Sequence, residues 1–180
     1  MLPDSSENRL WVPVGLASLI SARLLLHAVL YRAGFISLTA DEFGRTVLAA
    51  GWAQRPHVLW EGPWLPLHMY IYGAALRSRW DMLWTPRSLG IFLGIVSILL
   101  MYILASRLLE SRRIGLISAF LLTVNPVHVW LSSTPLTALP HATLVLAAVL
   151  GLILYLKDNR QYYIYLGAFM LALGNGFRFE

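Results

Sequence analysis

Two adjacent carboxylates, Asp41 and Glu42, are the side chains of this sequence best suited to catalysis. They lie in a polar segment, residues 39–45, just after the first long apolar stretch. A carboxylate at the edge of an apolar domain can act as a general base on an alcohol or an amine. The pair could also help to bind a divalent metal together with a phosphate group, although neighbouring side chains on a helix diverge. The chain has no cysteine and no HExxH spacing, so a metal site built from protein ligands alone is not expected.

The same acids also match a structural pattern at the start of a helix. In a capping box, a Ser or Thr caps the first turn and a Glu three residues later bonds back to it. Thr39 and Glu42 have this spacing, and both acids complement the positive end of a helix dipole. Judged from the residues alone, capping is the stronger interpretation. The two roles are compatible, because a cap made by Glu42 would hold the turn and leave Asp41 to project toward a cavity.

A further candidate is a cation inside the first apolar segment. Arg23 and His27 lie four residues apart, and therefore on one face of a helix. Ionisable residues within a membrane span are functional candidates, and Arg23 could bind an anionic lipid phosphate. The alternatives are that Arg23 extends to the membrane interface or packs against a neighbouring helix.

The composition indicates a membrane protein. Hydrophobic residues make up 58% of the chain and charged residues 13%, against roughly 25% charged in soluble domains. The net charge of +5 comes almost wholly from arginines clustered between the apolar segments, which is typical of loops at a membrane surface. The sequence has no basic stripe with interleaved aromatics, so nucleic-acid binding is not expected. It also has no P-loop and no glycine-rich dinucleotide motif.

We therefore expect an all-α, polytopic transmembrane helix bundle of about five spans, forming a single membrane domain over residues 1–180. Each expected span is an apolar stretch that approaches or exceeds the length needed to cross ~30 Å of hydrocarbon. The third span contains Asn125-Pro126, which predicts a kink. The expected spans are residues 10–31, 88–106, 114–131, 135 or 141 to 156, and 161–177.

A long loop, residues 32–87, separates the first two spans. Periodic apolar residues predict two short helices in this loop, residues 43–53 and 67–79. Five of the seven tryptophans fall in the loop, and tryptophan prefers the lipid headgroup region. Both helices are therefore expected to be amphipathic and to lie along the membrane surface.

Charges in the short loops predict the orientation. Basic residues follow the second and fourth spans, whereas the connection between the third and fourth spans carries no Lys or Arg. The positive-inside rule then makes the N-terminus cytoplasmic and the loop with Asp41 external, in the plasma (inner) membrane if the source is bacterial. The basic residues that set this orientation are Arg107, Arg112, Arg113, Lys157 and Arg160.

In the order of its motifs the chain resembles the polytopic GT-C glycosyltransferases of the dolichyl-phosphate-mannose-protein mannosyltransferase type, glycosyltransferase family 39. The acidic pair opens the first external loop, and a Pro-Leu-aromatic helix follows it at residues 64–70. Residues 102–109 are similar to the family's Tyr-x-Leu-Ala-x-Arg-Leu motif. The other similar motifs are Asn125-Pro126 before Trp130-Leu131-Ser132, Pro86-Arg87, and the Arg-aromatic-Glu of residues 178–180.

The resemblance implies transfer of a sugar from a polyprenyl-phosphate donor to an acceptor on the external face. Asp41 matches the family's catalytic aspartate, the general base that deprotonates the acceptor, and Glu42 would support it. Arg23, Arg45 and His68 are the candidates for substrate binding. The implied partners are the lipid-linked sugar and membrane lipids, together with further transmembrane segments or a partner subunit.

Two features depart from the family pattern. Family members commonly carry an acid after Leu-Thr in the second external loop, whereas Ala138 follows Leu136-Thr137 here. The relatives also have many more spans, so the chain is expected to be the N-terminal portion of such an enzyme and inactive alone. The alternative is a truncated or degenerate non-catalytic membrane protein that acts as a lipid-binding or assembly subunit. A transporter ranks last, because the second to fifth spans carry few polar residues.

Overall fold

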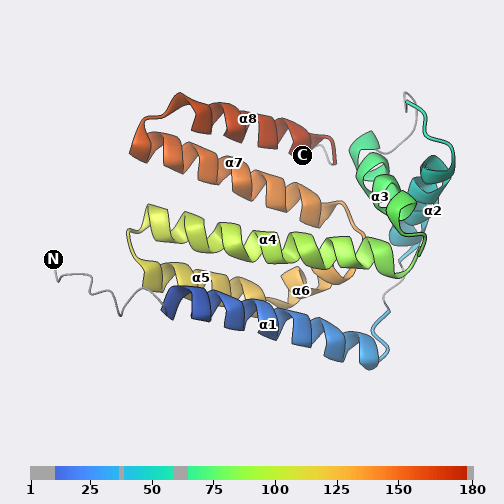
Figure 1. Cartoon of the computed structure of the whole chain (residues 1–180), viewed down its shortest axis with the longest axis horizontal. Helices are drawn as coiled ribbons and strands as arrows, with labels where there is room; N and C mark the ends of the chain where they lie inside the picture. Colours follow the sequence, from blue (N-terminus) through green and yellow to red (C-terminus); the bar gives the residue numbers. More distant parts are fainter. Residues whose placement is uncertain (1–10, 37–38, 59–64, 178–180) are drawn as a thin grey trace.

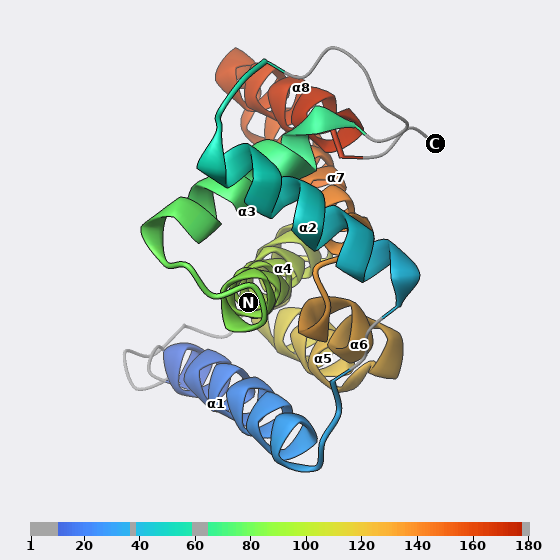
Figure 2. The ribbon, with the colours of Figure 1, turned by 90° about the vertical axis from the view of Figure 1, so that its right-hand side faces the viewer.

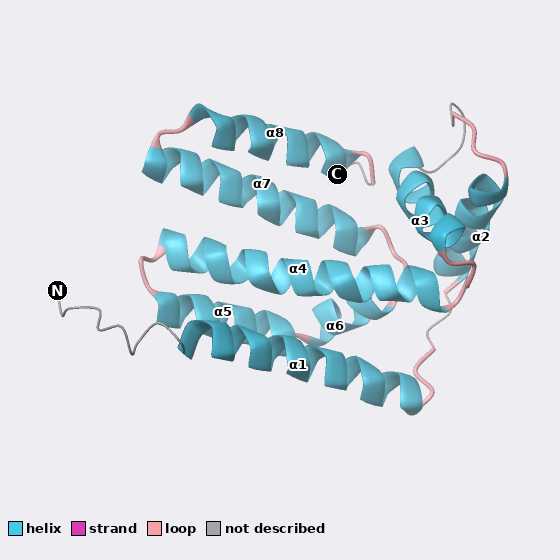
Figure 3. Cartoon of the chain, in the orientation of Figure 1, coloured by secondary structure: helices cyan, strands magenta, loops and turns pink. Residues whose placement is uncertain are grey.

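The computed structural model describes residues 11–36, 39–58 and 65–177, and every regular element in these residues is an α-helix (Figure 3). The all-α prediction is confirmed. The helices are α1 Trp11–Arg32, α2 Ala40–Gln54, α3 Pro66–Ser78, α4 Trp84–Leu108, α5 Arg112–Val124, α6 Pro126–Ser133, α7 Ala138–Asp158 and α8 Gln161–Asn175.

The long helices form a bundle with α4 at its centre (Figure 1). α4 packs against α5 and α7, while α8 packs against α7 and α1 against α5. Two glycines bring α7 and α8 into backbone contact, since a Cβ added at Gly151 would lie 3.0 Å from the Cα of Gly167. Small residues at such contacts are typical of helix packing in membranes.

Several polar side chains lie inside this bundle, and many large apolar side chains lie on its surface. Arg23 and His27 of α1 are buried, whereas Leu25 of the same helix and Phe92 of α4 are more than half exposed. A soluble protein would bury its apolar side chains, so the surface of the bundle is suited to contact with lipid. The structure therefore supports the assignment as a membrane protein.

Within the described residues, three helices are long and apolar enough to span a membrane: α1, α4 and α7. The bent pair α5 and α6 is a fourth candidate. The sequence predicted about five spans, and the difference lies in α8. Its 15 residues extend only about 22 Å, short of the ~30 Å hydrocarbon layer. After the end of α8, Phe177 is buried and its ring lies edge-on to His68 of α3.

The predicted kink at Asn125-Pro126 is a complete break, because α5 and α6 meet there at an angle of 62°. Pro126 has no N–H to continue the helical hydrogen bonds of α5. The side chain of Asn125 instead caps α6 by accepting a hydrogen bond from the His128 N–H at 3.0 Å. The break therefore ends one helix and starts the next within two residues.

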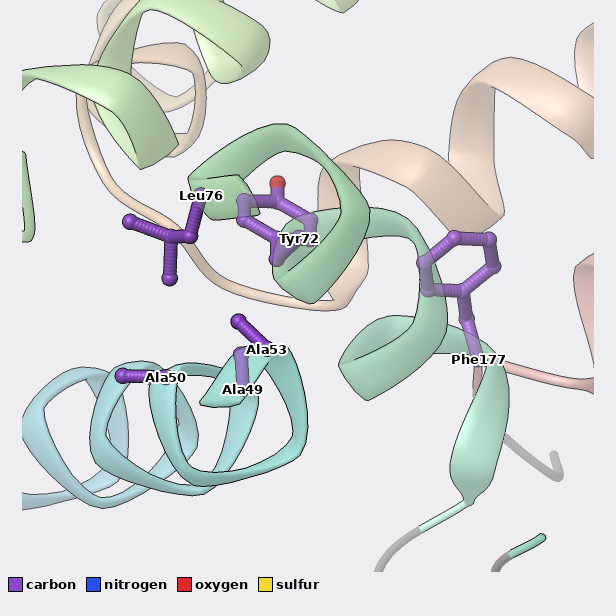
Figure 4. Packing of buried hydrophobic residues seen from close by; sticks show 6 residues of the cluster. All are labelled: Ala49, Ala50, Ala53, Tyr72, Leu76 and Phe177. Carbon is purple, nitrogen blue, oxygen red and sulfur yellow. The ribbon is translucent and has the colours of Figure 1, made fainter. Parts of the chain in front are cut away.

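The two predicted loop helices, α2 and α3, pack together and lie across one end of the bundle (Figure 2). Their contact is close because a Cβ at Gly73 would meet the carbonyl oxygen of Ala49 at 2.9 Å. Small side chains of α2 face larger ones of α3 and Phe177 in one apolar cluster (Figure 4). The cluster consists of Ala49, Ala50, Ala53, Tyr72, Leu76 and Phe177.

Candidate functional site

The capping box predicted at the start of α2 is present. The Oγ1 of Thr39 accepts a hydrogen bond from the Glu42 N–H at 3.3 Å, and Glu42 Oε2 accepts one from the Thr39 N–H at 3.0 Å. The Glu42 side chain is only 1% exposed. Glu42 is therefore turned back into the fold, where it holds the first turn of α2.

A buried arginine faces the other oxygen of Glu42. Nη2 of Arg87, in the first turns of α4, lies 3.8 Å from Glu42 Oε1, which has no hydrogen-bond partner in the described part of the chain. Nη1 of Arg87 donates a hydrogen bond to the carbonyl of Leu83 at 2.9 Å. This pair links α2 to the end of a span. Arg87 was not among the predicted site residues, because the predicted second span began at residue 88 and left Arg87 in the loop, whereas α4 begins at Trp84.

Asp41 points away from its neighbour, as expected for adjacent residues on a helix. Its side chain is 47% exposed, and Arg45 Nε donates to both carboxylate oxygens, at 3.0 Å and 2.9 Å. The two residues are separated by one helical turn, where opposite charges attract. Asp41 is thus an accessible carboxylate whose direction is set by Arg45.

A small pocket of about 210 Å³ adjoins the head of α2. Glu42, Phe43 and Thr46 form one wall, and Arg87 and Pro135 contribute from other elements. The lining is mostly apolar apart from the Glu42–Arg87 pair, and the volume is below the ~300 Å³ of the smallest common ligand sites. Asp41 lies in the same helical turn of α2 as Glu42 and Phe43, but its side chain does not line the pocket.

His68 lies in the first turn of α3 and is 1% exposed. Its ring stacks on that of Tyr72 with centroids 4.2 Å apart, and neither ring nitrogen has a hydrogen-bond partner among the described residues. Burial, together with the positive charge of Arg45, lowers the pKa of His68 to about 3, and the charge of Asp41 acts in the opposite direction. His68 is therefore a neutral, packed side chain close to the Asp41–Arg45 pair.

Arg23 belongs to a separate polar group, here called the Arg23 cluster, between α1 and the broken helix α5–α6. Its guanidinium is fully buried and donates to the carbonyls of Thr123 and His128, at 2.6 Å and 2.8 Å, and to Ser132 Oγ at 2.7 Å. No carboxylate pairs with Arg23 in the residues that the structure describes. Of the three roles open to Arg23, packing against a neighbouring helix is the one seen.

Tyr31 joins the last turn of α1 to the last residue of α6. Its hydroxyl donates to the carbonyl of Ser133 at 3.2 Å. His27 bonds to Ser133 Oγ at 3.1 Å, which completes the connection back to the cluster. Polar side chains of α1 thus bond to the broken helix α5–α6 from Arg23 to Tyr31.

The fold brings four of the five predicted site residues to one end of the bundle, namely Asp41, Glu42, Arg45 and His68, and places Arg23 apart from them. Within the described residues, no three His, Asp or Glu side chains lie close enough to hold a metal ion. Comparisons with protein-family models, with curated proteins and with solved structures found no match.

Proposed function

We propose that the chain is the N-terminal portion of a membrane glycosyltransferase that moves a sugar from a polyprenyl-phosphate donor to an acceptor on the external face. The single observation that best supports this is the divergence of the two acids at the head of α2. Glu42 is buried in the cap, whereas Asp41 is accessible at the end of the membrane bundle. The order of motifs that resembles the GT-C enzymes supplies the reaction class.

In the proposed reaction Asp41 accepts the proton of the acceptor hydroxyl while the hydroxyl oxygen attacks the anomeric carbon of the sugar. The bond from that carbon to the phosphate oxygen breaks, and its electron pair leaves with the polyprenyl phosphate. Arg45 is already bound to Asp41 and can turn to the leaving phosphate, since a guanidinium binds carboxylates and phosphates alike. Arg23 and His68 are buried among protein groups, so Arg45 is the first candidate for this role.

The proposed orientation makes the α2–α3 end of the bundle external. Arg107, Arg112 and Lys157 lie at the opposite end, where α4 and α7 end and α5 begins. Basic residues in short loops favour the cytoplasmic side, which supports this direction.

The test uses the native gene product in its own membranes. A denaturing gel and intact mass spectrometry first establish whether the native chain carries further spans. Transfer of labelled sugar from a polyprenyl-phosphate donor is then compared between wild type and Asp41→Asn. We expect a loss of about a hundredfold or more with unchanged thermal stability, since a general base contributes on that order. Asp158→Asn, which removes an exposed carboxylate at the opposite end, is the matched control and should retain activity. Full activity of Asp41→Asn would exclude Asp41 from the mechanism.

A second candidate is a non-catalytic membrane protein that serves as a lipid-binding or assembly subunit. The observation that favours it is that both acids already have local partners, Glu42 in the capping box and Asp41 in its ion pair with Arg45. In this case, deleting the chain would leave no transfer reaction missing, and Asp41→Asn would not alter recovery of the partner complex. Loss of sugar transfer on deletion would instead favour the enzyme.

A further inference from the structure

A second, larger pocket lies where α4 ends and α5 begins. These helix ends are at the opposite end of the bundle from α2 and α3 (Figure 1). The volume of the pocket is about 760 Å³, which is within the range of roughly 300–1,000 Å³ found for small-molecule sites. The last turns of α4, the turn to α5, the start of α5 and the end of α7 all contribute to its wall. Four segments of the chain therefore converge on this pocket.

Cationic side chains from three helices line the pocket: Arg107 of α4, Arg112 of α5 and Lys157 of α7. Among the described residues of the lining one is acidic, Glu110, whose carboxylate accepts a hydrogen bond from Lys157 Nζ at 2.6 Å. The described lining therefore carries three cationic side chains and one acidic side chain. Guanidinium and ammonium groups that converge from three helices suit the binding of an anion such as phosphate.

The start of α5 adds to the attraction for an anion. Ser111, which lines the pocket, caps α5 by accepting a hydrogen bond from the Ile114 N–H at 3.4 Å. The N-terminal end of a helix carries partial positive charge and favours anionic groups. The position of α5 is fixed by close packing on α4, because a Cβ at Gly115 would lie 2.8 Å from the carbonyl oxygen of Tyr102.

We propose that this pocket binds the phosphate of an anionic lipid headgroup. α4 and α7 are membrane spans that end beside the pocket, so its cations lie at the depth of the headgroups. Arginine forks and a lysine ammonium are the groups that proteins use for phosphate. Free inorganic phosphate has the same chemistry, and the experiment separates the two sources. The proposal is independent of the sugar-transfer reaction, since Asp41 lies at the other end of the bundle.

The test measures lipid binding to the whole chain, purified in detergent, by native mass spectrometry. Phosphatidic acid is titrated against phosphatidylcholine of equal chain length. The double variant Arg107→Gln/Arg112→Gln removes two cations of the pocket. The control Arg113→Gln/Arg160→Gln removes two exposed cations at the same end that are outside the lining. We expect the affinity for phosphatidic acid to fall about tenfold or more in the pocket variant, and less than about twofold in the control.

Further variants and conditions make the result decisive. Ile103→Trp keeps every charge but fills the pocket, and it should also weaken binding; this variant decides the question if the arginine variant fails to fold. Equal losses in the pocket and control variants would show general attraction to a basic surface and overturn the proposal, as would unchanged binding in Ile103→Trp. Displacement of the lipid by millimolar inorganic phosphate would assign the pocket to free phosphate instead. Asp41→Asn should leave lipid binding unchanged.

Discussion

Arg23 of α1 donates a hydrogen bond of 2.6 Å from its Nη1 to the backbone carbonyl of Thr123, 100 residues further along the chain. Thr123 lies in the last turn of α5, where the break before Pro126 leaves carbonyl groups without helical N–H partners. The positive guanidinium also complements the negative C-terminal end of α5. Arg23 therefore caps a broken helix from the neighbouring span.

Replacing Arg23 with methionine should destabilise the protein by about 2–4 kcal/mol, because several buried acceptors lose a charged donor at once. The stability of Arg23→Lys should lie between those of wild type and Arg23→Met. A lysine keeps the charge but lacks the forked guanidinium that reaches Thr123 and Ser132 together. Thermal unfolding in detergent measures both effects. Arg32→Met, at the exposed end of the same helix, is the control; if it costs as much as Arg23→Met, the bonds across the break are not what stabilises the bundle.

The features that the sequence predicted are local ones. The capping box depends on Thr39 and Glu42 three residues apart, and the break in the third span depends on a single dipeptide. Apolar length located α1, α4 and α7, since a span is set by consecutive residues. In the capping box and the helix break, the residues that cause the structure lie within one or two helical turns of each other, so the sequence alone reveals them.

The features that the sequence could not predict depend on contacts between distant segments. Nothing next to Arg23 shows that its partners are Thr123 and Ser132, and nothing next to Arg87 shows that it faces Glu42. The predicted fifth span, which is α8 in the structure, is not among the four candidate spans. Its apolar composition resembles that of the others, but the helix is too short to cross the hydrocarbon layer.

The capping box of α2 gives a second prediction. Thr39→Ala removes the side-chain oxygen that binds the Glu42 N–H, and should lower the free energy of unfolding by about 1 kcal/mol. Thr39→Ser keeps that oxygen and should be close to wild type. Chemical unfolding followed by tryptophan fluorescence, to which Trp52 of α2 contributes, measures the difference. Equal stability of the alanine and serine variants would show that the cap contributes little.

The close contact of α2 with α3 gives a third prediction, from two glycines in the same pair of helices. A Cβ at Gly73 would lie 2.5 Å from the Trp52 ring and 2.9 Å from the Ala49 carbonyl, so Gly73→Ala should destabilise by about 1–3 kcal/mol. A Cβ at Gly51 meets nothing within 4 Å, and Gly51→Ala should stabilise by up to about 1 kcal/mol through helix propensity. Melting temperatures of the two variants should therefore shift in opposite directions, and a shift of the same sign would contradict the packing described here.

The buried imidazole of His68 gives a fourth prediction, on pH. Its pKa is about 3 in the folded protein, against an ordinary value of 6.5, because burial opposes the charged form and Arg45 repels it. As the pH falls below 6.5, the unfolded chain takes up a proton at His68 while the folded protein does not. The contribution of the neutral His68 ring to the free energy of unfolding is therefore fully present above pH 6.5. It is lost as the pH falls from 6.5 toward the pKa of about 3 in the folded protein.

His68→Phe keeps an aromatic ring beside Tyr72 and removes both buried nitrogens, so it should leave stability at pH 7 unchanged or higher. Between pH 7 and pH 5 it should lose less stability than wild type, by about 1–2 kcal/mol, since each unit of pH below the unfolded pKa contributes about 1.4 kcal/mol. Melting temperatures at the two pH values give this difference. His57→Gln, which removes an exposed histidine of the same loop, should keep the pH dependence of wild type. If His68→Phe also keeps the pH dependence of wild type, the pKa of His68 in the folded protein is near its ordinary value and the ring is not buried as described.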